Sequence, residues 1–258
     1  MEDIRRLRAR FEDYSKKYKT IKMRREDGIL ELTVHTNDGP LQWGRLPHAE
    51  LEEAFMNIGR DRDNKVVILT GTGTDFSGPR ADPQVNKALH KMTPDEWGEL
   101  GWESKGLLSN LLAIDVPMIS AVNGPAVRHA ELPVMCDIVL ATETAAFQDS
   151  AHYVGGLVPG DGVHIVFPMV MGLNRGRYFL LTGQVLGARE AKEIGVVNEI
   201  LPKDALLPRA WELARKLLEQ PELNRRYARI LLTEHLRRQI NDLLPYGLAL
   251  EGLAVVNH

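Results

Sequence analysis

Cysteine is nearly absent from this chain of 258 residues. The single one, Cys136, excludes an intramolecular disulfide and cannot form a zinc site by itself. Its neighbours are mostly apolar, which favours a packed position in the core over a role as a nucleophile. A fold held together by disulfide bonds is therefore excluded.

Long apolar runs and a surplus of positive charge are also missing. No stretch approaches the roughly 20 apolar residues of a membrane span, and the start of the chain, MEDIRRLRARFEDYSKKYK, is too charged for a signal peptide. Lysine and arginine number 32 against 35 acidic residues, so the formal charge is −3 and gives no basic surplus for nucleic acid. We expect a cytoplasmic protein with neither a membrane nor a nucleic-acid partner.

What the sequence does contain is an alternation of strand and helix patterns typical of a single α/β domain, without repeat or linker. Two β-prone runs around Glu26-Asp27-Gly28 predict a hairpin. The apolar runs 66–70 and 118–122 are typical of parallel strands covered on both faces. A polar helix is expected over 3–18, and a helix capped by Thr93 and begun by Pro94. The other predicted elements are helices from 47 onward and at 163–171, 175–182, 188–194, 203–219 and 222–256, and strands at 136–141, 145–148 and 196–201.

The stretch from Ile119 to Asp161 carries the strongest indication of function. Its first strand stops at Asn123-Gly124-Pro125, and His129 follows at the carboxyl end, where ligands of α/β sheets tend to bind. A later loop carries His152, and Asp161 lies between two glycines nine positions further on (161 − 152). Two histidines and an acid are therefore expected in one neighbourhood.

Several segments resemble the crotonase (enoyl-CoA hydratase/isomerase) superfamily, and together they cover nearly the whole chain. They are KVVILTGTG with the following Phe76-Ser77 loop, PMISAVNGPA, CDIVLATETAAF, GLVPGDG and RYFLLTGQVLGAREAKEIGVVNEI. The resemblance implies an α/β fold with a crotonase-like spiral core of β-β-α turns over residues 1–200. It also implies a C-terminal helical trimerisation region over 201–258, and a homotrimer or a dimer of trimers.

The departures from that superfamily are informative. Members that act on CoA thioesters hold the thioester oxygen with two backbone N–H groups. Here Pro79 has no N–H to offer in the first loop, and Arg128-His129-Ala130 replaces the glycine run of the second. Leu132 and Ala151-His152 stand where the two glutamates of the hydratases are expected. Hydration of an enoyl thioester therefore lacks its acid and its base.

The residues that stand there instead resemble the 6-oxocamphor hydrolase group, crotonase relatives that cleave β-diketones without CoA. The resemblance implies a cofactor-independent reaction on a small cyclic diketone and no metal ligand. It implies a catalytic role for His129, His152, Asp161 and Glu251, and substrate binding by Trp43 and His48.

Splitting a 1,3-diketone with water, a retro-Claisen reaction, needs residues of these types. It requires a base for the water, donors for the carbonyl oxygen as it becomes an oxyanion, and an acid for the departing enolate. His152 suits the base if Asp161 binds its other ring nitrogen and fixes the tautomer. Trp43 offers an indole N–H to the second carbonyl, His129 is a candidate proton donor, and Glu251 is a candidate for steering the water.

Each of these residues also has a structural interpretation. The histidines are candidates for buried hydrogen-bonding groups, Asp161 for a helix cap at Gly162, Trp43 for packing, and Glu251 for a solvated helix face. Two other functions stay open. One is a CoA-thioester hydratase, isomerase or hydrolase with an altered acid and base, and the other is an inactive trimeric scaffold.

Overall fold

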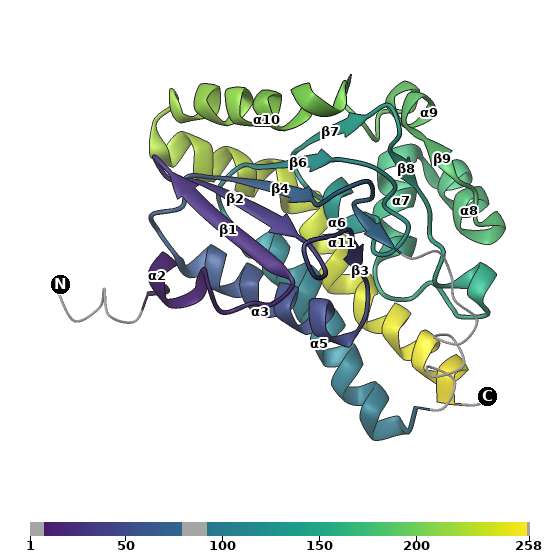
Figure 1. Cartoon of the computed structure of the whole chain (residues 1–258). Coiled ribbons are helices and arrows are strands. Elements are labelled where there is room, and N and C mark those ends of the chain that lie inside the picture. Colours follow the sequence, from purple (N-terminus) through teal and green to yellow (C-terminus); the bar gives the residue numbers. More distant parts are fainter. Residues whose placement is uncertain (1–7, 79–91, 257–258) are drawn as a thin grey trace.

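The computed structural model describes residues 8–78 and 92–256 (Figure 1). Within them, one sheet of six strands has the order β1-β2-β4-β6-β7-β10. The hairpin of β1 and β2 is antiparallel, and all later neighbours pair in parallel. The strands are β1 (Ile21–Glu26), β2 (Ile29–Val34), β4 (Val66–Gly71), β6 (Met118–Val122), β7 (Ile138–Thr142) and β10 (Glu199–Leu201).

Both faces of this sheet are covered, as the continuous apolar strands require. On one face Ile68, Ile119 and Leu140 pack against α10 (Lys203–Leu218), which lies along one side of the sheet in Figure 1. On the opposite face the other side chains of the same strands meet the larger part of the core. That face is covered by α3 (Arg45–Arg60), α5 (Pro94–Ala113), α7 (Val163–Met171) and α11 (Glu222–Val256).

A second, smaller layer of short strands follows the main strands one by one. β3 (Leu41–Gln42) comes after β2, β5 (Ser77–Gly78) after β4, and β8 (Ala146–Phe147) after β7. β3 pairs in parallel with β5, and Ala126 bridges β5 to β8 in parallel. The succession of long strand, short strand and helix confirms the predicted β-β-α repeat. It also brings the carboxyl ends of the short strands to one edge, where loops from distant parts of the chain meet.

The remaining helical segments are α6 (Glu131–Val134), the short 3-10 turn η1 (Tyr153–Gly155), α8 (Leu173–Thr182) and α9 (Ala188–Glu193), and β9 (Leu186–Gly187) pairs with β8. Two of these helical segments, α8 and α9, were predicted, and two, α6 and η1, were not. α11 then returns beneath the sheet and packs against α5 and α7. Arg229 fixes it there, since this fully buried side chain donates to Asp137 Oδ2 at 2.8 Å and to the carbonyl of Ile114.

The polar helix predicted over residues 3–18 is wrong for the part of it that can be described. α2 spans Phe11–Tyr14, and residues 1–7 lie outside the described chain. Tyr14 is buried and donates to Asp61 Oδ2 at 2.8 Å, so tertiary contacts help to hold this segment in place. They determine its conformation more than helix propensity does, because a short helix is not stable by itself.

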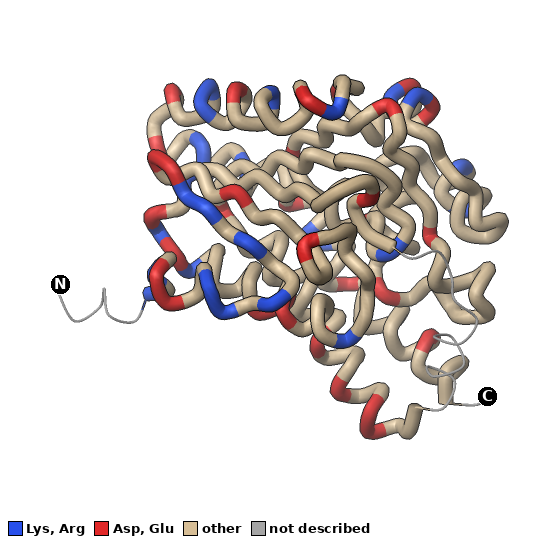
Figure 2. Tube along the Cα trace, viewed as in Figure 1, with Lys and Arg blue, Asp and Glu red and all other residues tan. Residues whose placement is uncertain are grey.

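Charges of both signs alternate along the outer elements. Figure 2 shows lysine and arginine interspersed with aspartate and glutamate along β1 and α10, in keeping with the formal charge of −3. Among the described helices, none has the length and apolarity needed to cross a membrane.

Candidate active site

A cavity of about 290 Å³ opens where the loops after the short strands meet α3, α5 and α11. Much of its wall is apolar, from Trp97, Leu100, Leu157 and Val255. The structure brings all six site residues of the sequence analysis to this one cavity. They are Trp43, His48, His129, His152, Asp161 and Glu251.

The short strands explain how residues so far apart in sequence converge. Trp43 follows β3, His129 follows the bridging residue Ala126, and His152 follows β8. The backbone N–H of Trp43 donates to the carbonyl of Gly78 at 2.7 Å, which ties the first of these loops to the second short strand. Parallel strands thus deliver the three side chains to the same edge.

His152 is buried and has acidic neighbours at both ring nitrogens. Its Nδ1 lies 2.7 Å from Asp149 Oδ1. Its Nε2 lies 3.2 Å from Asp161 Oδ2 and 3.6 Å from Glu251 Oε1. The predicted pairing of His152 with Asp161 is therefore present, but through Nε2. The partner expected to fix the tautomer from the other nitrogen is Asp149, which the sequence analysis did not name.

His129 repeats this arrangement on the opposite side of Asp161. Its Nδ1 lies 2.7 Å from Glu131 Oε1, and its Nε2 lies 3.6 Å from Asp161 Oδ2. The backbone has φ 47°, a left-handed conformation that suits glycine better than other residues. This chain keeps the glycine-like conformation where the superfamily has a glycine run, and it places an imidazole there.

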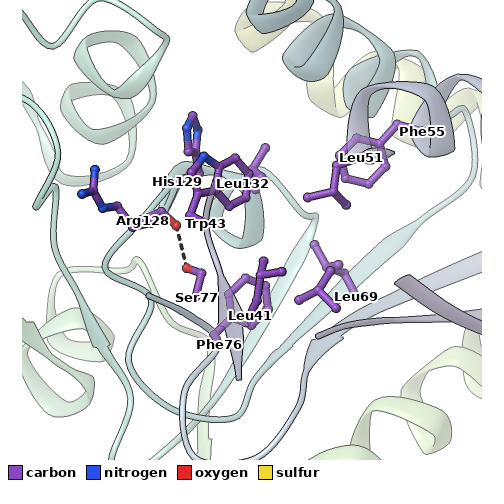
Figure 3. Close-up of a pocket in the computed structure, with 11 residues that line it drawn as sticks. Leu41, Trp43, Leu51, Phe55, Leu69, Phe76, Ser77, Arg128, His129 and Leu132 are labelled. Carbon is purple, nitrogen blue, oxygen red and sulfur yellow. Dashed lines mark hydrogen bonds between the residues drawn. The ribbon is translucent and has the colours of Figure 1, made fainter. Parts of the chain in front are cut away.

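Trp43 stacks on His129, with ring centroids 4.0 Å apart and an interplanar angle of 29° (Figure 3). Behind this pair lies a tightly packed apolar layer formed by Leu41, Leu51, Phe55, Leu69, Phe76 and Leu132. Both rings are therefore supported from behind and present their polar edges at fixed positions. Leu132, which stands where a hydratase glutamate was expected, belongs to this layer.

His48 lies on the first turns of α3, with its ring edge-on to Trp43 and His129. Its Nδ1 is hydrogen-bonded to Glu103, and its Nε2 lies 3.3 Å from Ser104 Oγ. His48 is thus the third imidazole in the cavity with a carboxylate at Nδ1. Two of these acids are close to their histidine in the sequence, which could have identified them as candidates. Asp149 lies three positions before His152, and Glu131 two positions after His129.

Glu251 comes from α11, and its side chain is buried instead of lying on a solvated helix face. Two glycines permit this approach. A Cβ on Gly160 would lie 2.2 Å from the carbonyl oxygen of Gly247, and one on Gly247 would lie 2.4 Å from the carbonyl oxygen of Gly160. The loop before Asp161 and the helix that bears Glu251 therefore touch backbone to backbone.

Burial and charge set the protonation of the group. Burial opposes the charge of His152, but Asp149 and Asp161 outweigh it and hold the pKa of His152 well above its usual value. Burial also opposes the charge of Asp161, yet His152 and His129 outweigh it and hold the pKa of Asp161 below its usual range. Burial is the main cause for Glu251 and raises the pKa of that carboxyl to about 8. At neutral pH the site therefore holds an ionised Asp161 beside a protonated Glu251.

The site also contains a potential set of metal ligands. One ligand atom each from His129, Glu131 and Asp161 lies within 4.8 Å of the others, a spacing at which a divalent ion finds donors. The hydrogen bond between His129 and Glu131 already occupies two of these groups. Pro79, whose missing N–H weakens a thioester oxyanion site in the sequence analysis, lies outside the described residues.

The enoyl-CoA hydratase/isomerase family model matches residues 46–254 of this chain. Among curated proteins, crotonyl-CoA hydratase of Syntrophomonas wolfei is 27% identical over 226 residues, which cover 87% of this chain and 85% of that protein. The 1,2-epoxyphenylacetyl-CoA isomerase of Escherichia coli is 29% identical over 197 residues, or 76% of this chain and 75% of that protein.

Among solved structures, a β-diketone hydrolase from the cyanobacterium Anabaena sp., bound to (S)-3-oxocyclohexyl acetic acid, is similar with a TM-score of 0.90. It is 47% identical, and the match covers 95% of this chain and 97% of that one. An enoyl-CoA hydratase/isomerase from Mycobacterium paratuberculosis has a TM-score of 0.83 and 25% identity, with 93% and 95% covered.

Proposed function

The chain belongs to the enoyl-CoA hydratase/isomerase (crotonase) family, and within it we propose a hydrolase that cleaves a carbon–carbon bond of cyclic or bicyclic β-diketones without a cofactor. The observation that carries this proposal is the position of Asp161, whose Oδ2 lies 3.2 Å from Nε2 of His152 and 3.6 Å from Nε2 of His129. This constellation replaces the two glutamates of a hydratase.

The proposed reaction balances with water alone. The oxygen of water adds to one carbonyl carbon, and the bond from that carbon to the central carbon breaks. The bonding electron pair becomes the enolate of the second carbonyl, and a proton then adds to the central carbon. When both carbonyls belong to one ring system, the product is a single keto acid.

In the proposed reaction each group has a role. The neutral form of His152 takes the proton of water at Nε2, and the share of this form grows with pH because the pKa of the imidazole lies well above its usual value. Asp161 stabilises the resulting cation from 3.2 Å. Glu251, 3.6 Å from the same nitrogen and protonated near neutral pH, holds the water in place. Trp43 donates its indole N–H to the second carbonyl, and His48, edge-on to Trp43, helps to shape this end of the substrate site. His129 gives the proton to the enolate, which suits a pKa that Glu131 and Asp161 raise against the opposing effect of burial.

The ligand of the Anabaena enzyme supports this substrate class. It is a ring ketone with an acetic acid side chain. Joining its carboxyl carbon to the ring carbon on the far side of the ketone, with loss of water, gives a bicyclic 1,3-diketone. Such a diketone is small, neutral and largely apolar, which matches a cavity of about 290 Å³ walled by Trp97, Leu100, Leu157 and Val255.

A CoA thioester is the second candidate substrate. The specific observation in its favour is that the curated relatives, crotonyl-CoA hydratase and 1,2-epoxyphenylacetyl-CoA isomerase, act on CoA esters by name. Arg45 and Arg128, which line the cavity, are cations of the kind that bind phosphate.

A panel of cyclic and bicyclic 1,3-diketones tests the proposal through the loss of their ultraviolet enol absorbance, with mass spectrometry for the keto acid. The assay is run without CoA and after exhaustive chelation, because His129, Glu131 and Asp161 have metal-ligand spacing. We expect full turnover under both conditions. Activity that is lost on chelation and restored by a metal refutes a metal-free reaction. Turnover of crotonyl-CoA alone supports the thioester function, and a folded oligomer inert to every compound supports a scaffold.

A further inference from the structure

Three acids stand behind the three cavity histidines. Asp149 lies 2.7 Å from Nδ1 of His152, and Glu131 lies 2.7 Å from Nδ1 of His129. Glu103 is hydrogen-bonded to Nδ1 of His48. Of the described residues that line the cavity, none is one of these three acids. They therefore meet the imidazoles from the side opposite the substrate.

We propose that Asp149 is the positioning residue of His152, and Glu131 that of His129, in the proposed diketone hydrolysis on which this inference rests. Each carboxylate accepts the Nδ1–H of its imidazole, which leaves Nε2 as the nitrogen that exchanges protons in the cavity. In this arrangement Asp161 does not orient either imidazole. Its carboxylate lies instead beside the Nε2 atoms of both histidines.

The surroundings of Asp149 suit a fixed support. The residue is 5% exposed, and the same oxygen that meets His152 also accepts from the backbone N–H groups of Ala151 and His152, each at 3.3 Å. Three hydrogen bonds from one loop hold this carboxylate in place. Glu131 is fully buried on α6, two positions after His129. Neither acid has solvent beside it to compete for the imidazole.

Asp161 is poorly placed for the same task. It lies at Nε2 of both histidines, at 3.2 Å and 3.6 Å, and it lines the cavity. A carboxylate at Nε2 would favour a proton on that atom, and a His152 so protonated cannot take one from water. The Nδ1 contact of Asp149 is the one that favours the reactive tautomer.

The test replaces Asp149 with Asn and observes the ring nitrogens of His152 by NMR in the substrate-free protein. An amide can donate to Nδ1, so Asp149→Asn should move the imidazole proton from Nδ1 to Nε2. It also removes a negative charge that raises the pKa of His152. The acid limb of the kcat/KM profile should therefore shift to lower pH, and kcat should fall on the order of a hundredfold or more. Glu131→Gln should likewise move the imidazole proton of His129 from Nδ1 to Nε2, which the ring signals of His129 would report.

A matched control is Asp61→Asn. Asp61 is an equally buried carboxylate that bonds Tyr14 and Arg25 at the far end of α3. The Asp61→Asn variant should be less stable than the wild type, while its His152 ring signals and the pH profile of its kcat/KM stay as in the wild type. The inference is overturned if Asp149→Asn keeps the Nδ1–H signal of His152 and the wild-type pH profile. If the wild type cleaves no diketone, the proposed function is refuted instead. The NMR experiment still tests the positioning role, because it is made on the substrate-free protein and needs no turnover.

Discussion

Glu251 is a carboxyl of the site whose ionisation is expected to change on folding. Its pKa is about 8 in the folded chain, mainly because it is buried, against 4.5 for an ordinary glutamate. Between these values the folded state holds a proton that the unfolded state has released. The free energy of unfolding therefore decreases as pH rises from about 4.5 to 8, by on the order of a few kcal/mol at most.

Replacing Glu251 with Gln should remove this pH dependence. Relative to the wild type, Glu251→Gln should gain thermal stability steadily from pH 5 to pH 8.5, which melting curves across that range would measure. Glu99→Gln, at an exposed position on α5, serves as the control and should track the wild type at every pH. A constant difference between Glu251→Gln and the wild type would show that Glu251 is ionised throughout.

His152 and Asp161 should act as one catalytic unit. Because Asp161 Oδ2 lies 3.2 Å from the reacting nitrogen, His152→Ala and Asp161→Asn each remove part of the same proton transfer. Each should lower kcat/KM on the order of a hundredfold or more, with about 1.4 kcal/mol per tenfold loss. The double variant should be no worse than the worse single one. Losses that multiply, in proteins whose circular dichroism is unchanged, would mean that the two residues work separately.

The resemblance predicted the six residues that face the cavity, and the structure places all six there. It did not predict Asp149, Glu131 and Glu103. The reason is physical, since an acid that supports an imidazole from behind can come from any element that passes at hydrogen-bond distance. Glu103 reaches His48 across 55 positions of the chain (103 − 48), and no local pattern marks such a pair.

At the scale of the elements, the contact between α11 and the loop before Asp161 controls the geometry of the site. Gly160→Ala would place a Cβ 2.2 Å from the carbonyl oxygen of Gly247 and 2.8 Å from Cβ of Glu251. Backbone must move to relieve such a clash, at a cost of about 1–3 kcal/mol. We expect a lower melting temperature and at least a tenfold loss of kcat/KM, because Glu251 is carried away from His152.

Gly98→Ala is the matched substitution on an open surface. Nothing lies within 4 Å of a Cβ at Gly98, which is exposed in α5, so alanine there should stabilise the protein by about 0.5–1 kcal/mol through helix propensity. Wild-type kinetics and a wild-type melting temperature for Gly160→Ala would show that the contact does not constrain the helix.

Most helices and strands could be predicted because their patterns are strong. Thr93 caps α5 as expected and forms a capping box with Glu96, and β6 covers Met118–Val122 as its apolar run indicated. The predictions failed where tertiary contacts, and not the local sequence pattern, determine the secondary structure. Val196 and Val197 were assigned to a strand, yet they are buried in the connection before β10. An apolar pair packs equally well in a loop that crosses the core.

At the scale of the whole molecule, we propose that the outer face of α11 takes part in association with copies of this chain. Leu231 and Leu232 are 75% and 80% exposed, and Tyr227 lies on the same helix at 58%. On the same helix Leu236 and Ile240 pack against the core of their own chain. Exposed apolar side chains that are neighbours on one helix are common at interfaces between protein chains.

Light scattering should give a mass of three or six times 29.0 kDa. The variant Leu231→Glu/Leu232→Glu should lower that mass towards one chain, because it introduces charges that are costly to bury in an interface. A wild-type mass near 29.0 kDa would contradict the trimer or hexamer directly.

Gly160 and Gly247 have a consequence for how this sequence diverges over evolutionary time. Each occupies the space where the side chain of the other would stand, so neither position can change freely while its partner stays the same. We expect descendants that keep a glutamate at position 251 to keep glycine at both positions. Lineages that acquire a larger residue at one should shift the C-terminal helix and lose the inherited reaction.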